Sequence, residues 1–171
     1  MNKRATTSRG AGRRPTARLG RLVGGLIGKK CWRVDFGYGG ALSLHFGRQI
    51  RYENSKMDGK RKGSWILDTC GTPWVLAATT EVVSSNDASE AELEAKVTAL
   101  EGRTVVNLSI LMPARILALT LSGKYSFLIV PTDADRRHEL PYWELFTPGR
   151  QLIAFGPGKR WSCRASDVLA P

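Results

Sequence analysis

The feature that most constrains the fold is a series of short apolar segments, separated by turn residues, that fills the chain after residue 31. Apolar and polar residues alternate over 32–36, a glycine-rich stretch follows at 37–40, and the alternation returns over 42–46. A period of two is typical of a strand with one buried face, and two such runs around a glycine-rich turn predict a hairpin.

Further segments are short, rich in β-branched or aromatic residues, and bounded by Gly, Pro or Asp. Turn residues at 122–123 and 148–149 join consecutive segments so closely that the strands should be antiparallel neighbours. Together with the hairpin, these segments predict about 7–9 short strands. The additional segments are 65–67, 74–78, 105–111, 115–121, 125–130, 143–146 and 151–155.

A capping box marks the start of one helix. Ser89 is followed three residues later by Glu92, a pairing in which each residue can satisfy the other's backbone donor. Apolar residues recur over 93–100 at helical spacing, Glu92 and Lys96 are four residues apart, and Gly102 can end the helix.

A second, shorter helix is predicted near the N-terminus. Glycines weaken it by about 1 kcal/mol each, so it should form by docking on the core. An alternative is a membrane-surface helix with Arg18, Arg21 and Lys29 on its rim. The sequence therefore predicts an α+β fold, with a mainly antiparallel sheet curled around a central helix at about 89–101. The apolar residues of the N-terminal helix are Leu19, Leu22, Val23, Leu26 and Ile27.

Positive charge is concentrated in two segments. The chain has 26 basic and 15 acidic residues, and residues 1–30 hold nine of the basic ones and no acidic one. Residues 48–62 hold six more basic residues, opposed only by Glu53 and Asp58. Residues 1–17 are polar and aperiodic, which predicts a flexible basic arm before a single globular domain over 18–171. Such charge can also serve as a solvated face or a solubilising tail.

We expect the arm and the second basic segment to bind an anionic partner, most plausibly nucleic acid or a nucleoprotein complex. No helix-turn-helix, zinc finger or base-stacking motif is visible, so little sequence specificity is expected. The residues expected to contact the anion are Arg4, Arg9, Arg13, Arg14, Arg18, Arg21, Arg48, Arg51, Lys60, Arg61 and Lys62.

No catalytic residue, metal site or cofactor is predicted. The glycine-rich segment 36–40 leads into a strand, which favours a hairpin turn over a phosphate-binding loop. Segment 133–139 is the only place where carboxylates and a histidine cluster, and a solvated loop explains it better than a metal or acid–base site does. His45 falls on the polar side of its strand and is expected at the surface.

The cysteines and the apolar runs indicate a cytoplasmic protein. Cys31, Cys70 and Cys163 are odd in number and widely spaced, unlike a disulfide framework, and their apolar surroundings predict buried, inert thiols. No apolar run reaches the roughly 18 residues of a membrane span. An Arg-rich, acid-free N-terminus also leaves a transit peptide open.

Aromatic residues near turns are candidates for contact with a partner. Trp32, Trp65 and Trp74 are in phase with aliphatic neighbours, which favours core packing for them. Partner contact is expected instead at Tyr142, Trp143, Lys159, Arg160 and Trp161, with core packing equally open for Trp161.

Several local motifs also resemble a group of small uncharacterised bacterial domains of immunity or defence-accessory type. The likeness covers residues 28–158 and is carried by the entry at 28–32, the strands at 39–47 and 63–65, and the closing segment 142–146. It implies a bacterial protein that binds a partner and has no catalytic residues. The alternative function is accordingly a protein-interaction module that docks a toxin or complex subunit through its near-neutral body.

Overall fold

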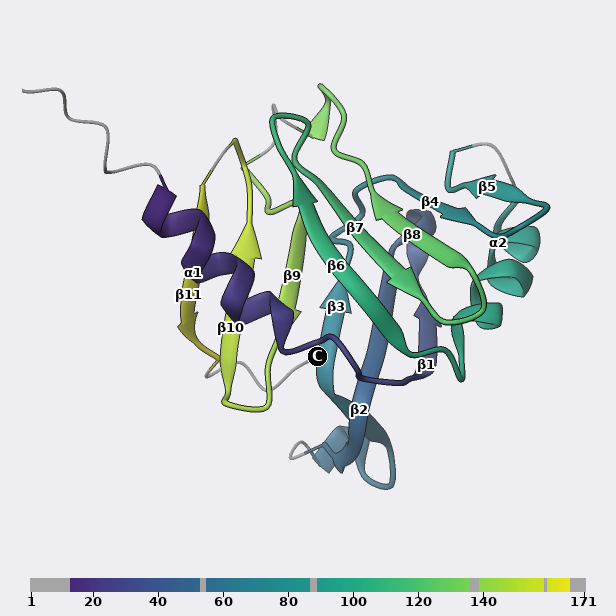
Figure 1. Cartoon of the computed structure of the whole chain (residues 1–171). Coiled ribbons are helices and arrows are strands. Elements are labelled where there is room, and N and C mark those ends of the chain that lie inside the picture. Colours follow the sequence, from purple (N-terminus) through teal and green to yellow (C-terminus); the bar gives the residue numbers. More distant parts are fainter. Residues whose placement is uncertain (1–12, 53–54, 87–88, 136–138, 159, 167–171) are drawn as a thin grey trace, which may run out of the picture.

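Eleven strands form two antiparallel sheets in the computed structural model, which describes residues 13–52, 55–86, 89–135, 139–158 and 160–166 (Figure 1). The larger sheet has the order β1 (Cys31–Phe36), β2 (Leu42–Arg51), β3 (Arg61–Asp68), β9 (Trp143–Phe146), β10 (Gln151–Phe155) and β11 (Trp161–Ala165). The smaller has the order β5 (Val82–Ser84), β4 (Trp74–Ala77), β8 (Tyr125–Ile129), β7 (Ile116–Leu121) and β6 (Val105–Leu111).

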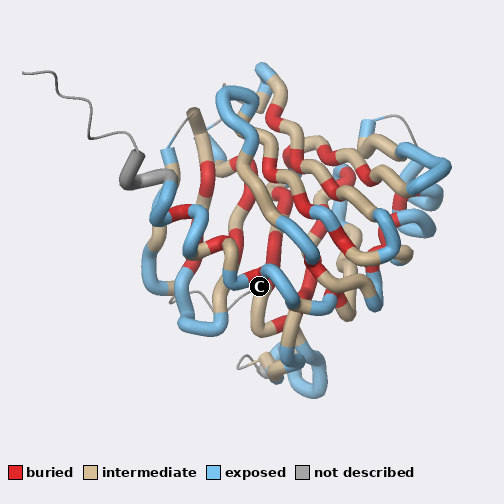
Figure 2. Tube along the Cα trace, viewed as in Figure 1, coloured by how far each residue is buried: buried red, intermediate tan, exposed pale blue. Residues whose placement is uncertain are grey.

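The core lies between the inner faces of the two sheets. Alternation along each strand turns its apolar residues inward, so buried and exposed positions interleave along the chain (Figure 2). In the larger sheet Trp143 and Phe155 stack with ring centroids 5.4 Å apart, and in the smaller sheet Trp74 packs on Phe127. On one side the sheets are joined by backbone hydrogen bonds between 28–31 and 102–105.

Helix α1 (Arg13–Gly24) docks on this core, as predicted from its apolar spacing. Leu19, Val23 and Leu26 are buried, each contributing about 1.5–3 kcal/mol, which outweighs a glycine cost of about 1 kcal/mol per residue. The helix begins at Arg13, so residues 13–17 belong to it and not to the arm in which their composition placed them. Neither described helix is long and apolar enough to cross a membrane.

Helix α2 (Glu90–Val97) starts at the predicted capping box, where the Glu92 carboxylate accepts hydrogen bonds from the backbone N–H and hydroxyl of Ser89. A short 3₁₀ helix, η3 (Thr98–Leu100), continues it. Lys96 pairs with Glu81 in the β4–β5 turn, where spacing had suggested Glu92. The helix thus lies at one end of the two sheets, beside β4 and β5 (Figure 1), and the sheets pack on each other more than around it.

The predicted strands correspond to nine of the observed ones, and the turns at 122–123 and 148–149 join hydrogen-bonded neighbours as expected. The short β5 and the edge strand β11 were not predicted. The chain also changes sheets between β3 and β4, where the sequence suggested one continuous sheet. Two further 3₁₀ turns, η1 (Tyr38–Gly40) and η2 (Ser55–Met57), lie in the connections on either side of β2.

Candidate nucleic-acid interface

The β2–β3 hairpin extends beyond the sheet at one end of the molecule, and its outer part, residues 48–62, is called the basic finger here (Figure 1). Its described cationic side chains are exposed, except that of Lys62, which is half-buried. Asp58 is the only carboxylate among the described finger residues, and Glu53 lies outside them. The cations are Arg48, Arg51, Lys56, Lys60, Arg61 and Lys62.

Two of these cations face each other across the hairpin. Arg51 and Arg61 are direct partners in the β2–β3 register. Like charges placed opposite one another destabilise a strand pair, because side chains at opposite positions lie close together. Diagonally across this pair, the Lys62 ammonium lies 5.1 Å from the centroid of the Tyr52 ring. The described part of the finger therefore places six cations close to a single carboxylate, that of Asp58.

A bulge bends the hairpin at the base of the finger. Phe46 pairs with Trp65 and Gln49 with Gly63, so two residues of β2 lie opposite Ser64 alone. Gly47 has a φ of +75°, and the following backbone N–H donates to the Ser64 hydroxyl. Such a bulge sharpens the local twist and bends the strand, which directs the finger away from the plane of the sheet.

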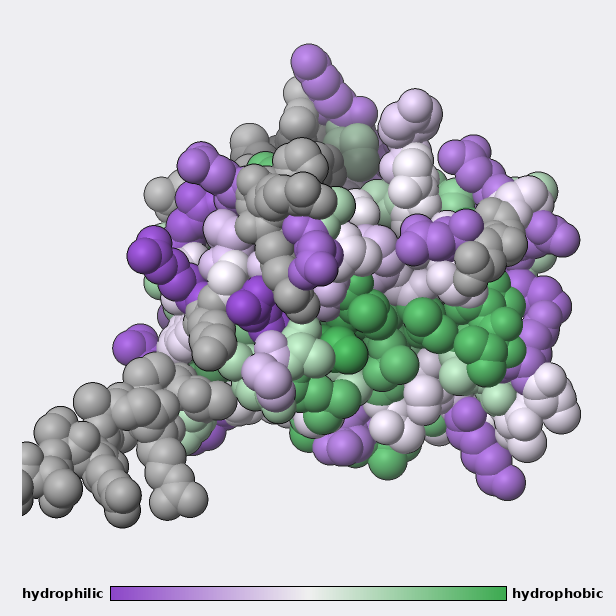
Figure 3. Space-filling model, turned by 90° about the horizontal axis from the view of Figure 1, so that it is seen from above, coloured by the Kyte–Doolittle hydropathy of each residue, from purple (hydrophilic) through white to green (hydrophobic). Residues whose placement is uncertain are grey.

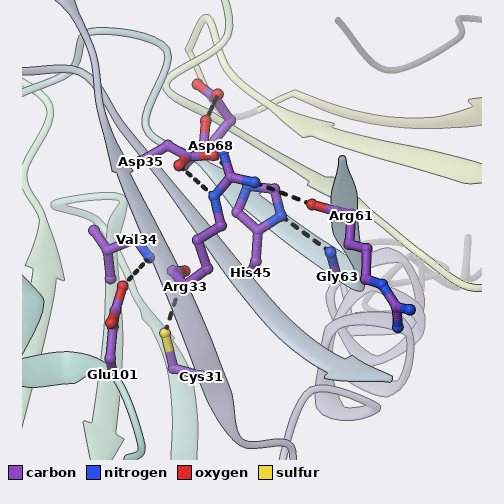
Figure 4. Close-up of polar contacts among 10 residues, drawn as sticks. Cys31, Arg33, Val34, Asp35, His45, Arg61, Gly63, Asp68 and Glu101 are labelled. Carbon is purple, nitrogen blue, oxygen red and sulfur yellow. Dashed lines mark hydrogen bonds and ion pairs between the residues drawn. The ribbon is translucent and has the colours of Figure 1, made fainter. Parts of the chain in front are cut away.

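A buried histidine connects the finger to the sheet (Figure 4). His45 Nδ1 accepts a hydrogen bond from the Gly63 N–H at 3.0 Å, and Nε2 lies 2.9 Å from Asp35 Oδ2. Asp35 Oδ1 accepts from Arg33 Nε at 2.6 Å, and the Arg33 guanidinium donates to the Arg61 carbonyl at 3.0 Å. These contacts link Gly63 of β3 to β2 and β1, and Arg33 of β1 in turn reaches the finger at Arg61.

The position of His45 corrects the expectation of a surface residue, because the side chain is only 2% exposed. It lies on the outer face of the sheet as its alternation indicated, but the bent hairpin brings the Gly63 backbone to it. Burial lowers the pKa of His45 below its usual value and outweighs the opposing effect of Asp35. Glycines at 47 and 63, inside an otherwise regular strand pattern, are the sequence signal that could have located this bend.

More positive charge adjoins the base of the finger. The Lys30 carbonyl accepts a hydrogen bond from the Gly47 N–H, and the Lys29 side chain runs past the same glycine. Arg18 and Arg21 are exposed on α1, while Arg4 and Arg9 lie outside the described residues. Arg13 and Arg14 belong to α1, whose first turn lies at a different end of the molecule from the finger tip (Figure 1).

The rest of the chain has no excess of positive charge that would attract a polyanion. Outside residues 1–30 and 48–62 the chain has eleven basic and thirteen acidic residues. In the smaller sheet, all of whose strand residues are described, the outward positions carry no charge, and hydrophobic side chains gather on part of the surface in Figure 3. These outward residues are Val75, Ala77, Val82, Ser84, Asn107, Ser109, Leu111, Ile116, Ala118, Thr120, Ser126 and Leu128.

The residues near turns that were expected to contact a partner range from fully buried to exposed. Tyr142 and Trp143 are fully buried, which corrects that expectation, and the Tyr142 hydroxyl accepts a hydrogen bond from the Gly158 N–H. Trp161 is half-buried against the core and Arg160 is exposed, whereas Lys159 lies outside the described residues. Among the residues described at this end of the chain, these side chains form no continuous aromatic contact surface.

The other candidate catalytic or metal-binding side chains do not cluster or already make hydrogen bonds within the fold. The Asp135 carboxylate accepts hydrogen bonds from the backbone and hydroxyl of Thr132, and His138 lies outside the described residues. Within the part of the chain that is described, no three His, Cys, Asp or Glu side chains are grouped as metal ligands. Burial raises the pKa of the Cys31 thiol to about 12 and raises that of Cys70 as well.

Comparisons with known proteins give no relative. No protein-family model matches the chain. No curated protein and no solved structure matches it either. The resemblance to bacterial immunity or defence-accessory domains therefore stays a prediction, and function has to be argued from the site.

Proposed function

We propose that this chain is a non-catalytic nucleic-acid-binding protein whose contact element is the basic finger. The carrying observation is the cross-strand pairing of Arg51 with Arg61, beside Lys60 and Lys62. In the free protein this pairing costs free energy. A phosphate held between the two guanidinium groups would offset that cost and add charge-assisted hydrogen bonds, for which the arginine fork is well suited.

Phosphate contacts of this kind favour binding that is insensitive to sequence. Each phosphate that a cation neutralises releases condensed counterions and adds about 0.7–0.9 to the slope of log affinity against log salt. The only aromatic residue described in the finger, Tyr52, lies under Lys62 and is half-buried, so stacking on unpaired bases is not its evident role. Lys29, Lys30, Arg18 and Arg21 supply further contacts in this proposal.

The test is fluorescence anisotropy of short labelled DNA and RNA, duplex and single-stranded, at several salt concentrations. A double variant, Arg51→Gln with Arg61→Gln, should weaken binding and reduce the salt slope by about 1.5–2. The matched control, Arg160→Gln with Arg164→Gln, removes the same charge from exposed positions outside the finger and should lose much less affinity.

Equal losses in the two variants would mean that net charge alone drives the binding, and the finger would not be the contact element. Absence of binding by the unmodified protein at low salt would overturn the nucleic-acid proposal altogether. Recovery of a stoichiometric protein and no nucleic acid from the native host would then favour the alternative, a bacterial protein-interaction module.

A further inference from the structure

The hydrogen bonds of His45 define which ring nitrogen carries the proton. The Gly63 backbone N–H is a donor, so the Nδ1 atom that faces it must be an unprotonated acceptor. Nε2 faces the Asp35 carboxylate at 2.9 Å, where a proton on this nitrogen makes a hydrogen bond. The neutral ring with hydrogen on Nε2 satisfies both neighbours at once.

A second proton would break one of these two bonds. It would place an N–H on Nδ1 against the N–H of Gly63, two donors facing each other in a buried site. The bond to Asp35 would survive and strengthen, because the ring would then carry a positive charge beside a carboxylate. The ionisable groups that face the ring or act on it are Asp35 and Arg33 from β1 and Asp68 from β3.

The bond that would be lost holds the base of the finger. Gly63 is buried at the bulge, and a Cβ there would lie 2.6–2.8 Å from backbone atoms of Phe46 and Trp65. The Gly63 backbone thus fits closely between β2 and the imidazole. Next to it, Lys62 and Arg61 begin the row of cations.

We infer that His45 is a positioning residue for the finger: the neutral imidazole fixes the finger on the sheet, and protonation releases it and weakens anion binding. The statement about binding depends on the proposed function, whereas the release of Gly63 does not. Since burial lowers the pKa below the ordinary value of 6.5, the ring is neutral at pH 7. The stability that this contact adds is present above pH 6.5 and is lost as the pH falls toward the lowered pKa.

The predicted effect of acid on anion binding is opposite to the effect expected from net charge alone. Acidification adds positive charge to a protein, and binding to phosphates, which stay ionised, ordinarily tightens as a result. If protonated His45 loosens the finger, a complex must also pay the entropy of ordering it. We therefore expect affinity to fall about five- to tenfold between neutral pH and a pH below the His45 pKa, about the effect of one hydrogen bond.

The experiment combines NMR with binding. In ¹⁵N-labelled full-length protein at pH 7, the His45 ring should show hydrogen on Nε2, and the Gly63 amide should exchange slowly. On acidification the Gly63 amide should lose protection with the same midpoint as the ring titration. His45→Asn, which retains an acceptor oxygen but cannot titrate in this range, should keep Gly63 protected in acid and should bind nucleic acid without the acid loss.

Two results would overturn the inference: a ring that carries hydrogen on Nδ1 at pH 7, or a Gly63 amide whose exchange protection is unaffected by the ring titration. Acid tightening of binding in both the unmodified protein and His45→Asn would overturn the link to binding. Because the NMR measurements contain no nucleic acid, failure of the proposed function leaves them valid as a test of the positioning role.

Discussion

Gly63→Ala is the substitution that most directly tests how the finger is anchored. The backbone conformation at position 63 does not require glycine, since its φ is not positive. It needs glycine for space, because a Cβ would lie 2.6 Å from the Trp65 carbonyl oxygen and 2.7 and 2.8 Å from the Phe46 nitrogen and oxygen. The two Phe46 atoms belong to the paired strand β2, so these contacts can be relieved only if β2 and β3 separate at the bulge, whereas the Trp65 oxygen lies in β3 itself.

The expected loss of stability in Gly63→Ala has two sources. Overpacking of a tight site costs about 1–3 kcal/mol. Separation of the strands would also remove the Gly63 N–H from His45 Nδ1 and leave a buried acceptor unsatisfied, at about 1–3 kcal/mol. A total of about 2–6 kcal/mol lowers the melting temperature of a domain this size by about 4–24 °C.

Thermal and urea unfolding followed by circular dichroism measure this loss. Gly59→Ala, in the same hairpin, is the control: its φ is +75° but no atom lies within 4 Å of the added Cβ. It should cost only the conformational penalty of about 1–2 kcal/mol. If Gly63→Ala were no less stable than Gly59→Ala, the close contact between the Gly63 backbone, β2 and His45 would be refuted.

Leu19→Ala should destabilise the protein by about 2–5 kcal/mol in urea unfolding because Leu19 is buried. Gly20→Ala should stabilise it by about 1 kcal/mol, since this position is on the exposed side of the same helix and no atom lies near the added Cβ. Cys31 should resist a thiol reagent at pH 8 in the folded protein and react after unfolding, since burial raises its pKa to about 12; rapid native labelling, read by mass spectrometry, would contradict this. Removal of residues 1–12 should leave the melting temperature nearly unchanged, while weaker binding to nucleic acid would show that the arm contributes contacts.

Local sequence signals predict the elements but not the division into two sheets. Alternation along 32–36 and 42–46 specifies a hairpin, because the pairing partners are neighbours in sequence. The partner of β3 on its other side is β9, which is far away in the sequence, and no local pattern identifies such a pairing. The turn at 70–73 therefore gave no indication that the next strand starts the second sheet.

Composition likewise predicts where charge is concentrated but not how it is arranged. An excess of cations over 48–62 is visible in the sequence, yet the pairing of Arg51 with Arg61 depends on the bulge, which shifts the register between the two strands. The burial of His45 depends on the same bulge, because only a bent hairpin carries the Gly63 backbone over the outer face of the sheet. Register is thus the step at which prediction from this single sequence stops.

A polar network of Arg33, Asp35 and His45 lies beside the cations of the finger. Arg33 adds a guanidinium close to the cations of the finger, where it donates to the Arg61 carbonyl. Asp35 compensates this charge directly and accepts from the neutral His45 with its second oxygen. One carboxylate thereby orients both side chains that reach the finger. Asp35 thus balances the charge of Arg33 within the fold, and the cations of the finger lie farther out, where a polyanion can reach them.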